Sequence, residues 1–222
     1  MHNSEYERLV QIYETTYGES DKRLLSQTLN QLISELNCIT SAEPENSEAF
    51  HLIGLCWYTL PEDSADNDRQ AEKAFRHCLA IDPEHQYANL FLGYLLFDIR
   101  RYEEAHERFV KIDPDFFVTQ TQQWRVVKND ELRLCCRLEL RPASVAFHEL
   151  DALCERYETD EELPVPGEIV SCVDQLVKRG ELPVRSLQAY ASRVLNMLQV
   201  SDNLSIAYLQ EPIMRLRRIV AQ

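Results

Sequence analysis

The sequence predicts an all-α protein, and three observations carry this prediction. The chain has 222 residues, of which 45% are hydrophobic, so it can bury a core without disulfides or metals. It has only five glycines, and it is rich in Leu, Ala, Glu, Gln and Arg, which favour helix. The stretch "AEKAFRHCLAIDP" at 71–83 is half repeated as "AHERFVKIDP" at 105–114, with the two alanines 34 residues apart. A period of this length indicates stacked helical hairpins.

Two successive hairpins are predicted from residues at helical spacing. The first has Phe50, Ile53, Gly54 and Trp57 on one helix, followed by Ala71, Phe75 and Pro83. The second has Asn89, Leu92, Gly93, Leu96, Ala105, Phe109 and Pro114. A glycine inside a helix costs about 1 kcal/mol relative to alanine, so another helix is expected to pack closely against each one. Each Asp-Pro pair turns the chain after its hairpin.

This pattern resembles the tetratricopeptide repeat (TPR), most clearly over residues 47–114. Ile53 stands where the family has Leu and Trp57 where it has Tyr, while Asn89 and Leu96 depart from the pattern. The resemblance implies an α-solenoid in which the first helix of each hairpin lines a concave groove. It also implies that the alanine, phenylalanine and proline positions hold the scaffold together, and that specificity lies elsewhere.

An earlier, degenerate hairpin is predicted over residues 4–44. Gly54 and Ala71 are 17 residues apart where Gly93 and Ala105 are 12 apart, so "LPEDSADNDR" (60–69) is expected to hold about five extra residues in a longer loop. With this correction, residues 29–44 become the second helix of a first unit. Its first helix is expected near 4–15, and "GESD" connects the two.

The second half is predicted to be helical but shows no clear repeat. Helices are expected near 117–126, 129–140, 143–158, 166–179, 185–199 and 203–220, with Pro212 kinking or dividing the last. The predicted domains are therefore residues 1–114, with about three hairpins, and residues 115–222. The second part either continues the array or forms a separate helical domain.

Charge and cysteine content restrict the class of function. Thirty-seven acidic and 23 basic residues give a formal charge of −14, which repels nucleic acid and favours a basic protein partner. The start of the chain does not look like a signal peptide, and no apolar run approaches 18 residues, so neither secretion nor membrane spanning is expected. The seven cysteines lack a CxxC pair and lie mainly among apolar residues. This pattern favours reduced, buried thiols in a cytoplasmic protein.

No enzymatic or cofactor motif is recognisable. The six histidines contain no HExxH, and no phosphate-binding or nucleophile-elbow motif occurs, so we predict no catalytic residues, no metal and no cofactor. Glu103-Glu104 and Glu161-Glu162 are interpreted as helix-start or loop charges. Arg215, Arg217 and Arg218 are interpreted as partners of the last helix dipole.

The predicted binding surface follows from the TPR resemblance. Residues left over from packing are expected to face the groove: Glu48, His51, Leu55, Tyr58, Thr59, Tyr87, Leu90, Tyr94, Phe97 and Asp98. The surface is rich in aromatic residues, which often dominate binding energy, although a short array would instead bury them. The groove lacks the Lys, Asn and Arg with which chaperone-binding TPR proteins hold a C-terminal carboxylate, so that ligand is not expected.

Three functions remain open from the sequence. The first is a non-enzymatic module that binds a protein or peptide through the groove and an acidic surface. The second is an immunity or antitoxin protein that neutralises a basic toxin, for which a strong negative charge gives fast association. The third, an enzyme without a recognisable motif, has no residue pattern in its favour. Self-association is not predicted either way.

Overall fold

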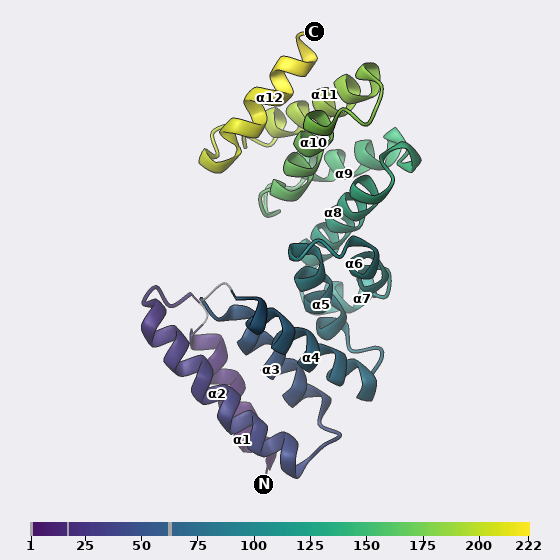
Figure 1. The fold of residues 1–222 in the computed structure, drawn as a ribbon. Helices are drawn as coiled ribbons and strands as arrows, with labels where there is room; N and C mark the ends of the chain where they lie inside the picture. Colours follow the sequence, from purple (N-terminus) through teal and green to yellow (C-terminus); the bar gives the residue numbers. More distant parts are fainter. Residues whose placement is uncertain (1, 17, 62–63) are drawn as a thin grey trace. The chain divides into compact units, whose positions relative to one another are not determined.

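The structure is a computed structural model that describes residues 2–16, 18–61 and 64–222. Within these ranges it contains α-helices and two short 3-10 helices but no strand, which confirms the all-α prediction (Figure 1). Its contacts divide the chain into two compact units, residues 1–99 and 100–222. The boundary falls between the two helices of the second predicted hairpin.

Unit 1 holds five helices that pack in chain order. They are α1 (His2–Thr16), α2 (Lys22–Ala42), α3 (Ser47–Thr59), α4 (Ala65–Ile81) and α5 (Gln86–Asp98). Helices α1 and α2 contact each other, as do α3 and α4, and α3 also contacts α2 and α5. The predicted core positions Leu32, Leu36 and Ile39 of α2 are buried, as is Leu9 of α1.

The glycine of the first hairpin is packed as predicted. A Cβ atom placed on Gly54 would lie 2.5 Å from two ring atoms of Phe75, closer than real carbon atoms approach. Ala71 and Phe75 of α4 are fully buried. The small residue on α3 therefore admits the phenylalanine ring of α4, and the first copy of the repeated stretch, at 71–83, is confirmed as a packing motif.

Asn89, which departs from the TPR pattern, has a structural use. Its amide Nδ2 donates to the carbonyl oxygens of Pro83 at 3.1 Å and His85 at 3.2 Å. The side chain is fully buried, so these bonds satisfy its donors and hold the turn before α5.

Two boundaries in unit 1 differ from the prediction. Residues 65–69, expected in a long loop, form the first turns of α4, because Ser64 accepts the Asn67 N–H and caps the helix. The second helix of the earlier, degenerate hairpin is α2, which begins at Lys22 instead of residue 29. Asp21 caps it by accepting the N–H groups of Arg23 and Leu24. In both cases the capping residue lies inside a segment that is predicted to be a loop.

Unit 2 holds the remaining helices. They are α6 (Tyr102–Phe109), α7 (Pro114–Thr119), α8 (Gln123–Leu140), α9 (Phe147–Thr159), α10 (Gly167–Arg179), α11 (Val184–Val200) and α12 (Gln210–Val220), with 3-10 turns at Pro142–Ser144 and Ala207–Leu209. Helix α8 contacts α6, α7, α9 and α10, and α11 contacts α9, α10 and α12. Gly180 ends α10 with φ of 65°, the left-handed value that glycine adopts easily.

Two helix predictions in this unit were wrong. The break expected between 126 and 129 lies at Gln120–Gln122, where Thr121 has φ of 57°, and α8 runs unbroken through residues 127 and 128. Pro212 does not divide the last helix, because α12 begins at Gln210 and the proline falls in its first turn. Proline is tolerated there, since the first N–H groups of a helix need no partner within it.

A buried polar cluster joins three helices of unit 2. The fully buried carboxylate of Glu131 on α8 accepts hydrogen bonds from Lys128 at 2.8 Å, from the Tyr157 hydroxyl at 2.6 Å and from the Ile169 N–H at 2.9 Å. Lys128 also pairs with Glu168. Burial raises the pKa of Glu131, while Lys128 opposes this rise. The cluster ties α9 and the start of α10 to α8.

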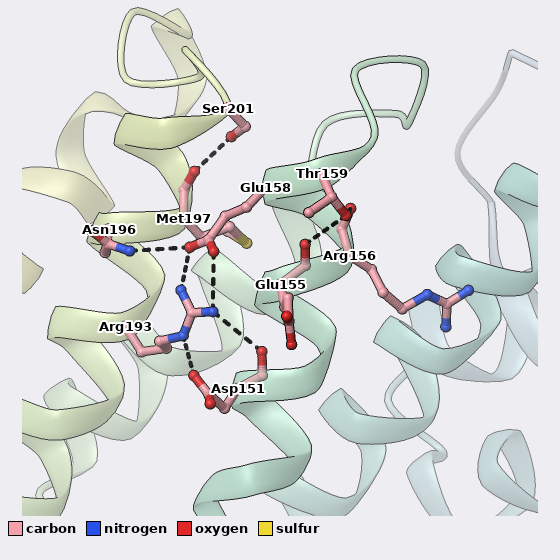
Figure 2. Close-up of polar contacts among 9 residues, drawn as sticks. All are labelled: Asp151, Glu155, Arg156, Glu158, Thr159, Arg193, Asn196, Met197 and Ser201. Atoms are coloured by element: carbon pink, nitrogen blue, oxygen red, sulfur yellow. Dashed lines mark hydrogen bonds and ion pairs between the residues drawn. The ribbon is translucent and has the colours of Figure 1, made fainter.

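A second polar contact joins α9 to α11. Arg193 of α11 pairs with Asp151 and Glu158 of α9, and Asn196 donates to Glu158 at 3.1 Å (Figure 2). Figure 2 shows the guanidinium between the two carboxylates, which lie about two helical turns apart on α9. The Arg193 side chain is 14% exposed, so this pair is partly shielded from water.

Other charged and thiol residues can now be placed. Arg215, expected to interact with the helix dipole, instead binds Asp174 of α10 through two bonds of 2.6 and 2.8 Å. The cysteines are free and buried as predicted, except Cys38, which is exposed. Across the described part of the chain, no helix is both long and apolar enough to cross a membrane.

Candidate functional site

The candidate site lies on helices α3 and α5 of unit 1. These are the first helices of the two predicted hairpins, and they contact each other. Helix α3 packs against α2, α4 and α5, and α5 packs against α3 and α4. Residues that face away from these neighbours are left for a surface formed jointly by α3 and α5.

The predicted groove residues fall into three groups by exposure. His51, Leu55 and Leu90 are buried and take part in packing. Thr59 and the four aromatic residues Tyr58, Tyr87, Tyr94 and Phe97 are half-buried, while Glu48 and Asp98 are exposed. The aromatic residues thus remain partly accessible, whereas the aliphatic ones do not.

Phe91 lies at the centre of this aromatic group, although it was not among the predicted residues. Its ring centroid is 5.6 Å from that of Tyr94, 6.4 Å from that of Tyr58 and 6.2 Å from that of His51. The first two contacts are edge-to-face, a favourable geometry for aromatic pairs. A signal was present in the sequence, because Phe91 follows Tyr87 by four residues and precedes Tyr94 by three, on one helix face.

A polar end lies beside the aromatic group. The Tyr58 hydroxyl donates to Asp98 Oδ2 at 2.7 Å, which joins the C-terminal turns of α3 and α5. Burial, and next the negative charge of Asp98, raise the pKa of Tyr58, so the phenol stays protonated. A cavity of about 360 Å³ opens here, lined by Trp57, Tyr58, Leu60, Pro61, Ser64, Asn67, Asp68, Asp98 and Ile99.

The opposite end of the same two helices carries histidines. His51 stacks against Tyr87, with centroids 6.1 Å apart, and its ring lies 4.8 Å from that of His85. Glu48, one turn before His51, reaches His85 Nε2 at 3.4 Å through Oε1. Burial, and next the neighbouring His85, lower the pKa of His51 to about 3, so this imidazole is neutral at physiological pH.

The chemistry of the site suits binding better than catalysis. Burial raises the pKa of the Cys56 and Cys78 thiols to about 12, so neither supplies a thiolate nucleophile. The tyrosine hydroxyl of the polar end is held protonated and donates to a carboxylate. The surface offers half-buried aromatic side chains, with the exposed carboxylates of Glu48 and Asp98 at its two ends.

Unit 2 contains a second cleft with a different character. It has a volume of about 510 Å³ and is lined by His106, Asp130, Arg133, Leu134, Arg137, Glu149, Ala152, Leu153 and Arg156. Its carboxylates already have cationic partners: Arg137 binds Glu149 at 2.6 Å, and Arg156 pairs with Asp130. Because both carboxylates are already paired with arginines, the cleft is a weaker candidate than the surface on α3 and α5.

Comparison with known proteins places the fold in the class of TPR-like helical repeats. A solved structure of PilF from Pseudomonas aeruginosa, a TPR-containing protein, superposes with a TM-score of 0.51. The match covers 95% of this chain and 89% of that one, with 16% sequence identity. No protein-family model and no curated protein sequence matches the chain. The likeness therefore supports the predicted hairpin fold and carries no information on partners.

Proposed function

We propose that the chain is a non-enzymatic, cytoplasmic module that binds a protein or peptide on the α3–α5 surface. The observation that carries this proposal is the row of half-buried aromatic side chains, Tyr58, Phe91 and Tyr94, in mutual contact on two adjacent helices. Large rigid side chains of this kind supply binding energy with little loss of conformational entropy. The helical-repeat fold supports the same class of function, and the buried free cysteines support the cytoplasmic location.

The partner that fits this surface is basic and partly apolar. Asp98 is exposed at one end of the aromatic row and Glu48 at the other, and Asp68 lines the cavity beside Tyr58. The formal charge of −14 would speed the approach of a cationic segment. Tyr87 and Phe97 extend the row, and the buried His51 ring contacts those of Tyr87 and Phe91.

A peptide-display selection against the purified chain tests this proposal. We expect peptides with basic and aromatic or aliphatic residues, whose affinity falls at least about tenfold in the Tyr58→Ala, Tyr94→Ala double variant. Tyr208→Ala is the matched control, because Tyr208 is 65% exposed and belongs to unit 2. Circular dichroism confirms that each variant is folded.

Two results would contradict the proposal. One is selected peptides that bind the double variant as tightly as the wild type; the other is binding that is lost equally in the Tyr208 control. Neutralisation of a basic toxin would use the same acidic surface, and no separate structural observation favours it.

A further inference from the structure

One carboxylate and two imidazoles form a cluster at the N-terminal ends of helices α3 and α5. Glu48 lies in the first turn of α3, His51 lies one turn later on the same face, and His85 is the residue that caps α5. One ligand atom from each of these residues, a carboxylate oxygen or an imidazole nitrogen, lies within 4.8 Å of the other two. No sequence motif reveals this cluster, because Glu48 and His51 are 34 or more positions before His85 and only the packing of α3 on α5 brings them together.

Both imidazoles are buried with unused nitrogen atoms. His51 is 8% exposed and His85 is 7% exposed, and within the described residues neither Nε2 has a hydrogen-bond partner. His85 Nε2 makes only the 3.4 Å contact with Glu48 Oε1, which is long for a hydrogen bond. Buried polar atoms are nearly always bonded, so two such atoms side by side call for a ligand between them.

The donor set selects the type of ligand. Two imidazole nitrogens and one carboxylate oxygen suit zinc and its first-row neighbours, whereas Mg²⁺ and Ca²⁺ prefer oxygen donors throughout. Metal binding requires neutral imidazole and ionised carboxylate.

One of the three distances between ligand atoms already fits such an ion. A tetrahedral ion with bonds of about 2.1 Å holds its ligand atoms roughly 3.4 Å apart. His85 Nε2 and Glu48 Oε1 already lie 3.4 Å apart. We propose that Glu48, His51 and His85 form a binding site for one divalent transition-metal ion of the zinc class, with an open fourth position.

Metal binding at this site is linked to the start of α5. His85 Nδ1 accepts the Ala88 N–H at 3.1 Å, so in the neutral ring the proton resides on Nε2. A metal ion at Nε2 moves this proton to Nδ1, and the cap hydrogen bond from Ala88 is then lost. This loss weakens metal binding roughly tenfold relative to a histidine that does not cap a helix. The Ala88 amide therefore reports directly on occupation of the site.

The test uses the full chain, treated with a chelator, in a Cys38→Ser background that removes the exposed thiol. Zn²⁺ is titrated calorimetrically, and Co²⁺ is followed by its visible absorption. We expect one ion per chain, Co²⁺ bands of tetrahedral type, and a shift of the Ala88 amide signal in NMR spectra. His85→Asn should weaken Zn²⁺ binding at least about 100-fold, because the loss of an outer partner alone costs 10- to 100-fold.

His85→Asn is chosen because asparagine also caps a helix, so the variant loses the imidazole and keeps the fold. His77→Asn is the matched control, since His77 is exposed on α4 outside the cluster. Absence of Zn²⁺ binding by the parent protein would overturn the proposal, as would equal affinity in the parent and His85→Asn. Peptide binding is tested separately, because the Tyr58→Ala, Tyr94→Ala variant keeps all three metal ligands.

Discussion

The two compact units are held together in different ways. In unit 1 the two helices of a hairpin meet through apolar packing, as where Phe75 of α4 fills the space above Gly54 of α3. In unit 2 the helices are joined by charged side chains, with Glu131 linking α8 to α9 and α10, and Arg193 linking α11 to α9. Apolar packing tolerates substitutions that conserve volume, whereas a buried charge that loses its partner is strongly destabilising. The units should therefore respond differently to substitution and to pH.

The largest expected effect is in unit 2. Glu131→Ala leaves Lys128, the Tyr157 hydroxyl and the Ile169 N–H without their buried acceptor. We expect the free energy of unfolding to fall by about 3–5 kcal/mol. Hydrogen exchange should show the earliest loss of protection in α8, α9 and α10. A Glu131→Ala protein as stable as the wild type would show that the cluster is not what holds these helices.

A pH experiment examines the corresponding buried group of unit 1. The pKa of His51 is lowered from 6.5 to about 3 by burial and by His85, so unfolding takes up a proton between these values. The free energy of unfolding should therefore fall as the pH decreases from 6.5 towards 4, by up to about 1.4 kcal/mol per pH unit from this residue. Denaturant titrations in the presence of a chelator, from pH 7 to pH 4, measure it.

The comparison of variants isolates the contribution of His51. His51→Leu should flatten the pH dependence, while His77→Leu, at an exposed position of α4, should leave it unchanged. If the His51→Leu profile has the same slope as the wild type, then the acid sensitivity comes from other groups.

The close contact inside the first hairpin gives the next prediction. Gly54→Ala places a methyl group 2.5 Å from the Phe75 ring, and the fully buried ring has little room to move. We expect destabilisation of about 1–3 kcal/mol, measured by denaturant titration. Adding Phe75→Leu should restore part of this loss, because the smaller side chain vacates the space. Simple addition of the two single effects would mean that the residues do not share this space.

The same difference between the two units explains which parts of the fold can be predicted from the sequence. Gly54, Phe75 and the Asp-Pro turns act locally and at fixed spacing, so the hairpins of unit 1 and the all-α class could be predicted. The hydrogen bond from Tyr157 to Glu131 and the pair of Arg193 with Glu158 each join residues more than 20 positions apart. No repeated spacing in the sequence marks these residues. Nothing in the sequence alone distinguishes them from surface charges.

In the candidate site, too, residues on one helix face can be predicted from the sequence, whereas contacts between two helices cannot. The half-buried state of Tyr58 and Tyr94 agrees with a helix face read from the TPR resemblance. His51, Leu55 and Leu90 are buried because α3 packs against α5, which the pattern of one helix does not report. Phe91 could have been found from its spacing, whereas the meeting of His85 with Glu48 depends on how two helices pack.

The smallest expected effect concerns the second polar contact of unit 2. Arg193→Met keeps most of the side-chain volume and removes the pairs with Asp151 and Glu158 (Figure 2). Asp151 is about half exposed, and part of the interaction is screened by water, so we expect destabilisation of only about 1 kcal/mol. A double-mutant cycle with Glu158→Gln measures the coupling. A coupling energy as large as the loss of stability in Glu131→Ala would mean that both contacts stabilise unit 2 to a similar extent. A value near zero would mean that the Glu131 cluster is the main polar link of unit 2.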